Sequence, residues 1–263
     1  MEDGKQKPDR KSEIGAVAHA IGLLRQLGAS KTPLGVNELA RRVSLHKSSV
    51  SRLMSTLENY GFVEREDPDG RYGLGVELVA LAGPMIADLD VVKVSRPVLR
   101  QMADETGETV YVAVWSGRDT IMIEQAKGER AVAHYAAPGT SMPTHASAAG
   151  KLFMAFRPDT YRSVMAEPEL EVFTEFTHVG DALQAELEEI RQNGFAVNDQ
   201  EYELESCGVA APIRDVNGVV VGALTVAAPK HRFSARQQMN MAVLIVRQAA
   251  ELSRRMGFST HAA

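Results

Sequence analysis

Apolar residues recur at helical spacing in three stretches near the start of the chain. Spacings of three and four residues place each set on one face of a helix, where it can be buried. The residues predicted to face inward are Ile14, Val17, Ile21 and Leu24 in the first stretch, Val36, Leu39, Ala40 and Val43 in the second, and Val50, Leu53, Met54 and Leu57 in the third. Gly28 is expected to end the first helix. The three apolar faces together predict a small helical core.

A short hairpin is predicted directly after the third helix. Residues 62–66 and 71–74 read as two strands around the turn Asp67-Pro68-Asp69-Gly70. In such a turn proline presets one backbone dihedral angle and glycine adopts the positive one. The order helix, helix, turn, helix and hairpin over residues 14–75 is that of a winged helix-turn-helix, which inserts one helix into the major groove of DNA. The alternative is a generic three-helix core with solvated charges.

The third helix has an outer face of hydroxyl and cationic side chains. Ser48, Arg52 and Ser55 lie opposite its apolar face. Hydroxyl groups can bind phosphates or base edges, and an arginine can bind guanine through two hydrogen bonds. The residues predicted to contact DNA are Arg42, Lys47, Ser48, Ser49, Arg52 and, on the wing, Arg71. The alternatives are that Ser48 only helps to cap the helix and that Arg52 is an ordinary surface arginine.

Residues 76–90 are predicted to form a linker helix between two domains. The segment is largely apolar, and Gly83 with Pro84 is expected to break or kink it. Its apolar face has no obvious partner in a single head, so it is either a dimer surface or a surface that packs on the C-terminal domain. Residues 1–13 are expected to be a flexible N-terminus, and residues 258–263 a C-terminal tail.

The pattern of residues 91–257 predicts an α+β domain, so the whole chain is expected to be an α+β protein of two domains. Helices are expected at 91–106, 147–156, 182–192 and 234–256, with Pro97 marking a break or a new start in the first of them. Strands are expected at 109–115, 120–125, 131–135, 195–197, 209–214 and 219–227. Short turn sequences between several of these strands indicate hairpins. Antiparallel strands flanked by helices are typical of this fold class.

Composition favours a cytoplasmic protein. The single cysteine, Cys207, cannot form an internal disulfide, which favours a reducing compartment. No apolar run is long enough to span a bilayer, and the polar first dozen residues do not resemble a secretory signal. The net charge is −5, yet residues 1–75 carry twelve Lys/Arg and ten Asp/Glu, so the acidic excess lies in the remainder. A weakly basic head on an acidic body suits a protein whose head alone meets phosphate.

Two segments resemble the effector-domain signature of IclR-type transcriptional regulators. The first is Thr144-His145-Ala146-Ser147-Ala148-Ala149-Gly150-Lys151, and the second is Gly194-Phe195-Ala196-Val197-Asn198-Asp199-Gln200-Glu201-Tyr202 followed by Ala210-Ala211-Pro212-Ile213-Arg214-Asp215. With the winged head, the resemblance covers residues 14–257. It implies a GAF-like effector-binding domain, a homodimer or homotetramer, and a repressor or activator of a catabolic operon that responds to a small metabolite.

The helix start at Ser147, Ala148, Ala149 and Gly150 is predicted to bind an anion. The free N–H groups of a first helical turn attract negative charge, and small side chains let a carboxylate approach the backbone. The alternative is that these small residues serve tight packing.

The resemblance also implies which residues line the effector pocket. Carried onto this chain, they are Ala148, Ala149, Asn198, Gly208, Thr225 and Ala227. Three of them depart from the family pattern, since Asn198, Gly208 and Ala227 stand where an acid, a cysteine and a serine are frequent. The loss of a charge and of side-chain volume predicts a carboxylate effector larger than pyruvate, with aromatic acids among the candidates. A register slip that makes Cys207 the pocket residue is left open.

Two classes of function follow from these observations. The leading hypothesis is a metabolite-responsive regulator that binds a pseudo-palindromic operator as a dimer or tetramer and needs no cofactor, metal or catalytic residue. The alternative is a hydrolase-like enzyme that uses Cys207 or His145 and carries a vestigial head. The sequence shows no pair of histidines at metal-ligand spacing, no nucleophile elbow and no phosphate-binding loop.

Overall fold

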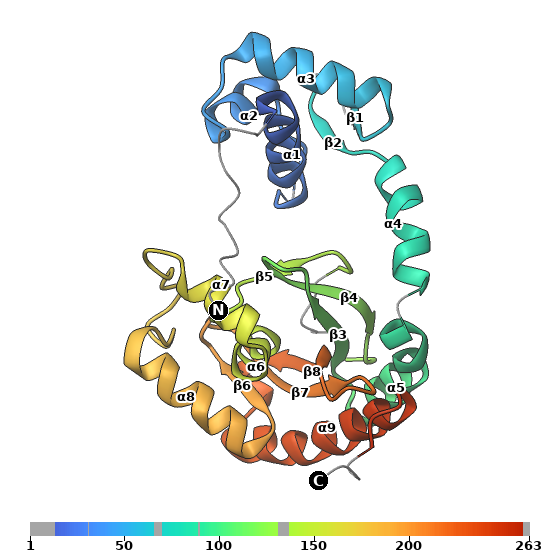
Figure 1. The fold of residues 1–263 in the computed structure, drawn as a ribbon, viewed down its shortest axis with the longest axis vertical. Helices are drawn as coiled ribbons and strands as arrows, with labels where there is room; N and C mark the ends of the chain where they lie inside the picture. Colours follow the sequence, from blue (N-terminus) through green and yellow to red (C-terminus); the bar gives the residue numbers. More distant parts are fainter. Residues whose placement is uncertain (1–13, 31, 66–69, 89, 131–136, 260–263) are drawn as a thin grey trace, which may run out of the picture. The chain divides into compact units, whose positions relative to one another are not determined.

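The structure, a computed structural model, describes residues 14–30, 32–65, 70–88, 90–130 and 137–259. The chain divides into two compact units, Met1–Met85 and Ile86–Ala263, and each is described by itself (Figure 1). None of the helices within the described ranges is long and apolar enough to cross a membrane.

The first unit is a winged helix-turn-helix, as predicted. Its elements are α1 (Gly15–Gly28), α2 (Val36–Arg42), α3 (Lys47–Asn59), β1 (Val63–Arg65), β2 (Tyr72–Leu74) and α4 (Glu77–Asp88). The two strands pair antiparallel, and Gly70 of the predicted turn has the expected positive φ of 72°. The rest of that turn lies outside the described residues. The core residues are Leu23, Leu27, Leu34, Leu39, Ala40, Val50, Met54, Val63 and Tyr72.

The buried face of α1 differs from the predicted one. Leu23 and Leu27 are buried, whereas Ile14, Val17 and Ile21 are 72%, 54% and 48% exposed. This helix carries apolar residues on two faces, and its periodicity alone does not decide which of them meets the core. The contacts with the other elements of the unit decide it.

Two prolines lie inside helices that the sequence predicts to be interrupted. Helix α4 runs unbroken through Gly83 and Pro84, and helix α5 (Asp90–Thr106) runs through Pro97. The predicted interruptions are therefore wrong. A proline inside a helix removes one hydrogen bond and crowds the preceding turn, at a cost of about 3 kcal/mol. In α5 the apolar face packs on the sheet of the second unit, and that burial offsets the cost.

The second unit is built on an antiparallel sheet, in line with the predicted α+β class. In spatial order its strands within the described residues are β5 (Ser141–Met142), β4 (Thr120–Ala126), β3 (Thr109–Trp115), β8 (Val220–Pro229), β7 (Ser206–Arg214) and β6 (Ala196–Asp199). The strand predicted at 131–135 lies outside the described residues. The two-residue strand β5 was not predicted, because so short a segment carries no alternation.

Helices cover both faces of this sheet (Figure 1). On one face lie α5 and α9 (Ala235–Arg255), the latter preceded by the short 3₁₀ helix η2 (Lys230–Arg232); on the other lie α6 (Ala148–Phe156), α7 (Pro158–Met165) and α8 (Gly180–Asn193). Alternate strand residues enter the two cores, so Val110 and Val112 face α5 and α9, while Tyr111 and Ala113 face α6. Helix α7 was missed, although Pro158 at its first position is a start signal.

Candidate DNA-binding face and effector site

The outer face of α3 is polar and contains no carboxylate. Its exposed residues are Lys47, Ser48, Ser49, Ser51, Arg52, Ser55, Thr56 and Asn59. On the opposite side, Val50 and Met54 are 0% exposed and anchor the helix in the core. The N-cap residue is His46 and no side chain caps the helix, so the hydroxyl of Ser48 is not used for capping. This face can donate hydrogen bonds to phosphates and base edges.

The other two arginines of the predicted DNA contact lie next to α3 in sequence or on the wing. Arg42 ends α2 and forms an ion pair with Glu38, with 2.6 Å between Nη2 and Oε1. Arg71 is exposed and directly precedes β2. Arg65 of β1, which sequence reasoning did not select, is held at 2.9 Å by Glu58 of α3. This pair ties the wing to α3, so the two elements present their polar residues as one body.

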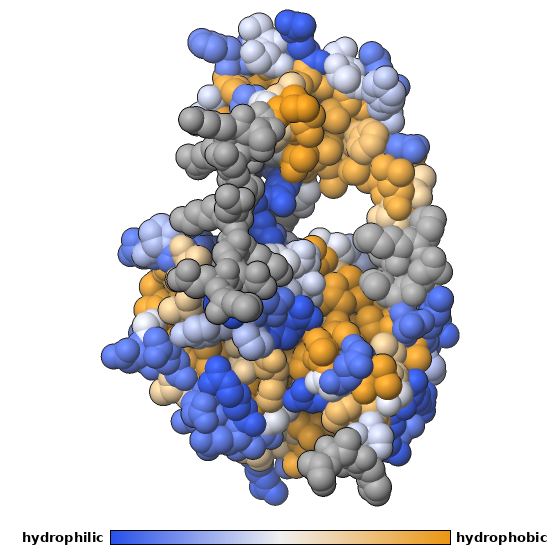
Figure 2. Space-filling view, viewed as in Figure 1, coloured by the Kyte–Doolittle hydropathy of each residue, from blue (hydrophilic) through white to orange (hydrophobic). Residues whose placement is uncertain are grey.

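The first unit also exposes a set of large apolar side chains. They are Ile14, Val17 and Ile21 on α1 and Val76, Val79 and Leu81 around α4, the last three being 74%, 69% and 59% exposed. Figure 2 shows apolar surface over both helices of this unit. Contiguous apolar surface on a soluble protein marks a site of contact with another chain.

In the second unit, three predicted pocket residues fall in one row across the sheet. The strand register pairs Asn198 with Gly208, Gly208 with Ala227, and Ala227 with Thr109. The row is built from four strands that are far apart in sequence. Sequence reasoning missed Thr109, because only the register of β3 and β8 brings it there.

A second row on the same face contains Thr225. The register places Ala196, Ala210, Thr225 and Tyr111 side by side on β6, β7, β8 and β3. Thr225 is 0% exposed, and its Oγ1 has no hydrogen-bond partner among the described residues. Tyr111 was not predicted to belong to the site, because its position in the middle of an apolar strand is typical of a core residue.

Helix α6 begins directly over these rows. A methyl group added to Gly208 would lie 3.8 Å from Cβ of Ala148 and 3.8 Å from Cγ2 of Thr225. The side chain of Ser147 caps the helix by accepting a hydrogen bond from the N–H of Gly150 at 3.2 Å. Within the described residues the N–H groups of Ala148 and Ala149 find no partner outside the helix, so they are the donors left for an anion.

Gly150 has a packing role at this helix start. A Cβ at this position would lie 2.1 Å from the carbonyl oxygen of Thr144 and 2.5 Å from its Cα. The backbone of residues before α6 therefore requires glycine here. Because its N–H is already bound by Ser147, Gly150 shapes the site and does not itself offer a free donor.

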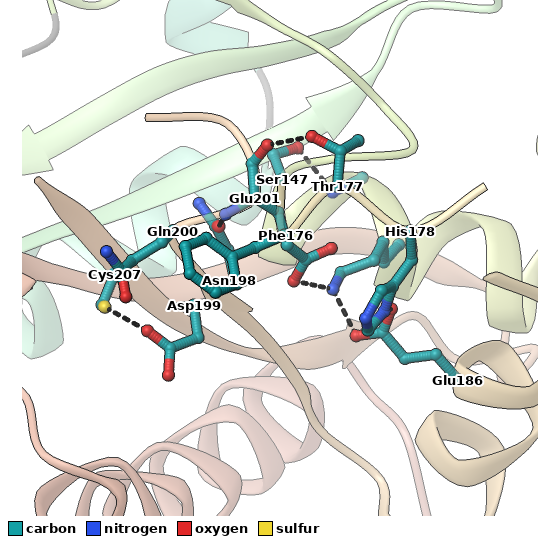
Figure 3. Close-up of polar contacts among 12 residues, drawn as sticks. Ser147, Phe176, Thr177, His178, Glu186, Asn198, Asp199, Gln200, Glu201 and Cys207 are labelled. Atoms are coloured by element: carbon teal, nitrogen blue, oxygen red, sulfur yellow. Dashed lines mark hydrogen bonds and ion pairs between the residues drawn. The ribbon is translucent and has the colours of Figure 1, made fainter. Parts of the chain in front are cut away.

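A buried ion-pair network lies one turn further along α6 (Figure 3). Lys151 is 0% exposed, and its Nζ forms ion pairs with Glu186 of α8 and Glu201, which follows β6. His178 Nδ1 lies 2.8 Å from the second oxygen of Glu186. The network joins the helix start to α8 and to the loop after β6.

Asn198 connects the first row to this network. Its Oδ1 accepts a hydrogen bond from the N–H of Glu201 at 2.9 Å, while Thr177 Oγ1 donates to the carbonyl of Glu201 at 2.6 Å. The carboxylate oxygen Oε2 of Glu201 is buried and has no partner among the described residues. Burial raises the pKa of Glu201, and the attraction of Lys151 acts in the opposite direction.

His178, Glu186 and Glu201 also have the composition of a metal site. Their ligand atoms lie within 4.8 Å of one another. The ammonium group of Lys151, however, contacts both carboxylates and is fully buried between elements. A divalent ion in the same place would be repelled by this ammonium group, so we describe the cluster as an ion-pair network and assign no metal to it.

A cavity of about 500 Å³ lies beside the start of α6. Its lining includes Met142, Thr144, His145, Glu171, Phe173 and Tyr202. The His145 ring stacks on Phe173 with 5.6 Å between centroids, and its Nε2 lies 2.8 Å from the carbonyl oxygen of Glu171. These contacts give His145 a structural role, and the cavity gives small molecules access to the surroundings of α6.

Comparison with known sequences decides the family. The family described as bacterial transcriptional regulator IclR C-terminal matches residues 84–254, and the IclR helix-turn-helix domain matches residues 16–67. The chain belongs to the IclR family of bacterial transcriptional regulators. The resemblance seen in the sequence is thereby confirmed, and the protein is a DNA-binding regulator of transcription.

Individual IclR-family proteins match along nearly the whole chain. The HTH-type transcriptional repressor AllR of Escherichia coli K12 is 27% identical over 98% of this chain and 96% of its own. A crystal structure of an IclR transcriptional regulator from Silicibacter sp. TM1040 superposes with a TM-score of 0.78 at 30% identity, covering 93% of this chain and 97% of that one. An IclR homologue from Microbacterium hydrocarbonoxydans, complexed with 4-hydroxybenzoate, gives a TM-score of 0.73 at 25% identity, covering 92% and 98%.

Cys207 lies on the other side of the sheet from the rows that face α6. Its side chain belongs to the core under α5 and α9, whereas Gly208, the next residue, faces α6. The thiol donates a hydrogen bond to Asp199 Oδ1 at 3.0 Å, and Lys230 pairs with the same carboxylate at 2.5 Å. Burial, together with Asp199, raises the pKa of Cys207 to about 12. The structure therefore does not bring Cys207 to the other predicted pocket residues.

Proposed function

We propose that this IclR-family protein binds a pseudo-palindromic operator as a dimer or tetramer and is controlled by a small carboxylate effector. The observation that carries the DNA-binding part is the carboxylate-free polar face of α3, fixed to the wing by the Arg65–Glu58 pair. Electrophoretic mobility shift with duplexes from the protein's own promoter region tests it. Specific binding that weakens steeply with salt supports the proposal, and equal affinity for unrelated duplexes contradicts it.

The alternative of a hydrolase-like enzyme receives little support. A thiol with a pKa near 12 remains protonated at neutral pH, and only the thiolate is a good nucleophile. His145, the other residue considered, is engaged with the Glu171 carbonyl and the Phe173 ring.

Replacing Arg52 by alanine is expected to weaken operator binding by about 1–3 kcal/mol if its guanidinium reads a base. Arg52 is exposed on the outer face of α3, and the side chain takes no part in the core of the head. The matched control is Arg162→Ala, which removes an exposed arginine from the second unit. Fluorescence anisotropy with a labelled operator measures both. An unchanged dissociation constant for the Arg52 variant removes this residue from the interface.

The exposed apolar side chains of α1 and α4 support a dimer. Val79 is 69% exposed in this set. We expect Val79→Asp to impair pairing of the heads and to reduce operator affinity on the order of 100-fold, because two linked heads bind with the advantage of high effective concentration. Sedimentation and footprinting report the result. A monomeric parent that protects one asymmetric half-site would rule out the paired arrangement.

The effector is proposed to bind between the start of α6 and the two rows of the sheet. Its carboxylate would accept hydrogen bonds from the free N–H groups of Ala148 and Ala149, so no arginine is needed. The rows beneath consist largely of alanine and glycine, which fits an effector larger than pyruvate. The related structure with bound 4-hydroxybenzoate supports an aromatic acid.

A thermal-shift screen of aromatic and aliphatic carboxylates tests the effector proposal. A compound that binds only the folded protein raises its apparent stability, by about 2.7 kcal/mol at a hundredfold excess over the dissociation constant. A compound found in this way should also change operator affinity. A panel in which no carboxylate does either overturns the proposed effector class.

A further inference from the structure

Tyr111 is a buried phenol without a strong hydrogen-bond partner. Its side chain is 5% exposed, and its hydroxyl donates to the thioether sulfur of Met142 at 3.6 Å. A thioether is a weak acceptor, so this contact recovers little of what the hydroxyl would gain from water. Burial raises the pKa of Tyr111 to about 12, which keeps the group a donor at neutral pH.

A second buried hydroxyl lies beside it. Thr225 is the direct neighbour of Tyr111 in the register of β3 and β8, and it is close enough to influence the pKa of the phenol. Its Oγ1 nevertheless makes no hydrogen bond of good geometry within the described residues. A buried hydroxyl without a partner costs about 1–3 kcal/mol. Two weakly satisfied hydroxyls side by side therefore indicate a place where a polar group of a ligand is expected.

Met142 stands between these hydroxyls and the cavity beside α6. It contacts the Tyr111 hydroxyl and also lines the cavity of about 500 Å³. Methionine is unbranched and adapts easily to a changed environment, so it can yield its place to a ligand. The neighbouring residues on this face of the sheet are small, namely Ala113, Ala210, Ala223 and Ala227. A ligand that displaces the thioether would meet both hydroxyls.

We infer that Tyr111, with Thr225, selects effectors that carry a hydrogen-bonding oxygen at the end remote from their carboxylate. The inference rests on the proposed effector site, in which the carboxylate lies at the start of α6. Helix α6 contacts β3 as well as β7 and β8, so one small molecule can reach from the helix start to the second row. The effector class is thereby narrowed from carboxylates in general to hydroxy- or oxo-substituted carboxylates.

Matched ligand pairs test this inference on the full-length protein. The pairs are 4-hydroxybenzoate with benzoate, and 4-hydroxyphenylacetate with phenylacetate, and isothermal titration calorimetry gives their dissociation constants. We expect the hydroxylated member of at least one pair to bind about five- to tenfold more tightly, the gain of one well-formed neutral hydrogen bond. Tyr111→Phe should abolish that ratio while leaving the affinity for the unsubstituted acid and for operator DNA unchanged.

The control variant is Tyr202→Phe, which removes a phenol that lines the cavity but lies outside the two rows. It should keep the parent's preference. Should Tyr111→Phe fold poorly, the isosteric variant Thr225→Val makes the same test from the neighbouring strand. A preference that survives in the Tyr111 and Thr225 variants, or is absent from the parent, overturns the inference alone. Failure of every acid to bind the parent overturns the proposed effector class, and this inference with it.

Discussion

Replacing Lys151 by methionine is expected to lower the free energy of unfolding by about 3–5 kcal/mol. Lys151 is 0% exposed and is the counter-ion of both Glu186 and Glu201. Without the ammonium group, two largely buried carboxylates would face each other, with the exposed imidazole of His178 as the nearest cationic partner. Urea denaturation followed by circular dichroism measures the loss.

The companion variant Glu201→Gln tests the same network from the other side. Two carboxylates share one ammonium group, and Oε2 of Glu201 has no partner among the described residues. Removing this charge leaves the Lys151–Glu186 pair in place, so the cost should stay near 1 kcal/mol. The double variant should therefore lose less than the sum of the two single losses. Strict additivity would show that the three groups do not act as a network.

The pH dependence of the Lys151→Met variant has a definite sign. Burial raises the pKa of Glu201, and the loss of Lys151 removes an interaction that lowers it. A carboxyl whose pKa is higher in the folded state binds more protons there than in the unfolded chain, so stability increases as the pH falls. The deficit relative to the parent should thus be smaller at about pH 5 than at about pH 7. A deficit that grows on acidification would contradict this assignment.

Gly150→Ala is expected to destabilise the protein by about 3 kcal/mol, although alanine favours helices over glycine by about 1 kcal/mol. The added Cβ would lie 2.1 Å from the Thr144 carbonyl oxygen. Backbone atoms cannot move aside as a flexible side chain can, so α6 must shift away from the segment that precedes it. Thermal unfolding measures the loss, and the effector response should fall with it.

The matched substitution Gly208→Ala should be nearly neutral. At this position the nearest atoms to an added Cβ are the Val226 carbonyl oxygen at 3.5 Å and the side chains of Ala148 and Thr225 at 3.8 Å. These are ordinary van der Waals distances. The two glycines were predicted for the same site, yet the structure assigns them opposite tolerances. Comparable losses in both variants would show that the close contact at Gly150 does not set its cost.

Local patterns were sufficient to predict the head and most strands. In α3 the spacing of Val50 and Met54 fixed the buried face, and with it the outer position of Ser48 and Arg52. Helix and strand periods act over a few residues, so they are legible in one sequence. The same reasoning chose the wrong face for α1, because that helix has two apolar faces and the core is shared with other elements.

The sequence by itself determined the family, the winged head and the small-residue start of α6. Tertiary structure alone decided which side of the sheet each residue meets. Side chains alternate along a strand, so Cys207 and Gly208 point to opposite cores although they are neighbours in sequence. Tyr111 and Thr225 are more than a hundred residues apart and become neighbours only through strand register. Register is a long-range property, set by how whole strands pack, and no local pattern contains it.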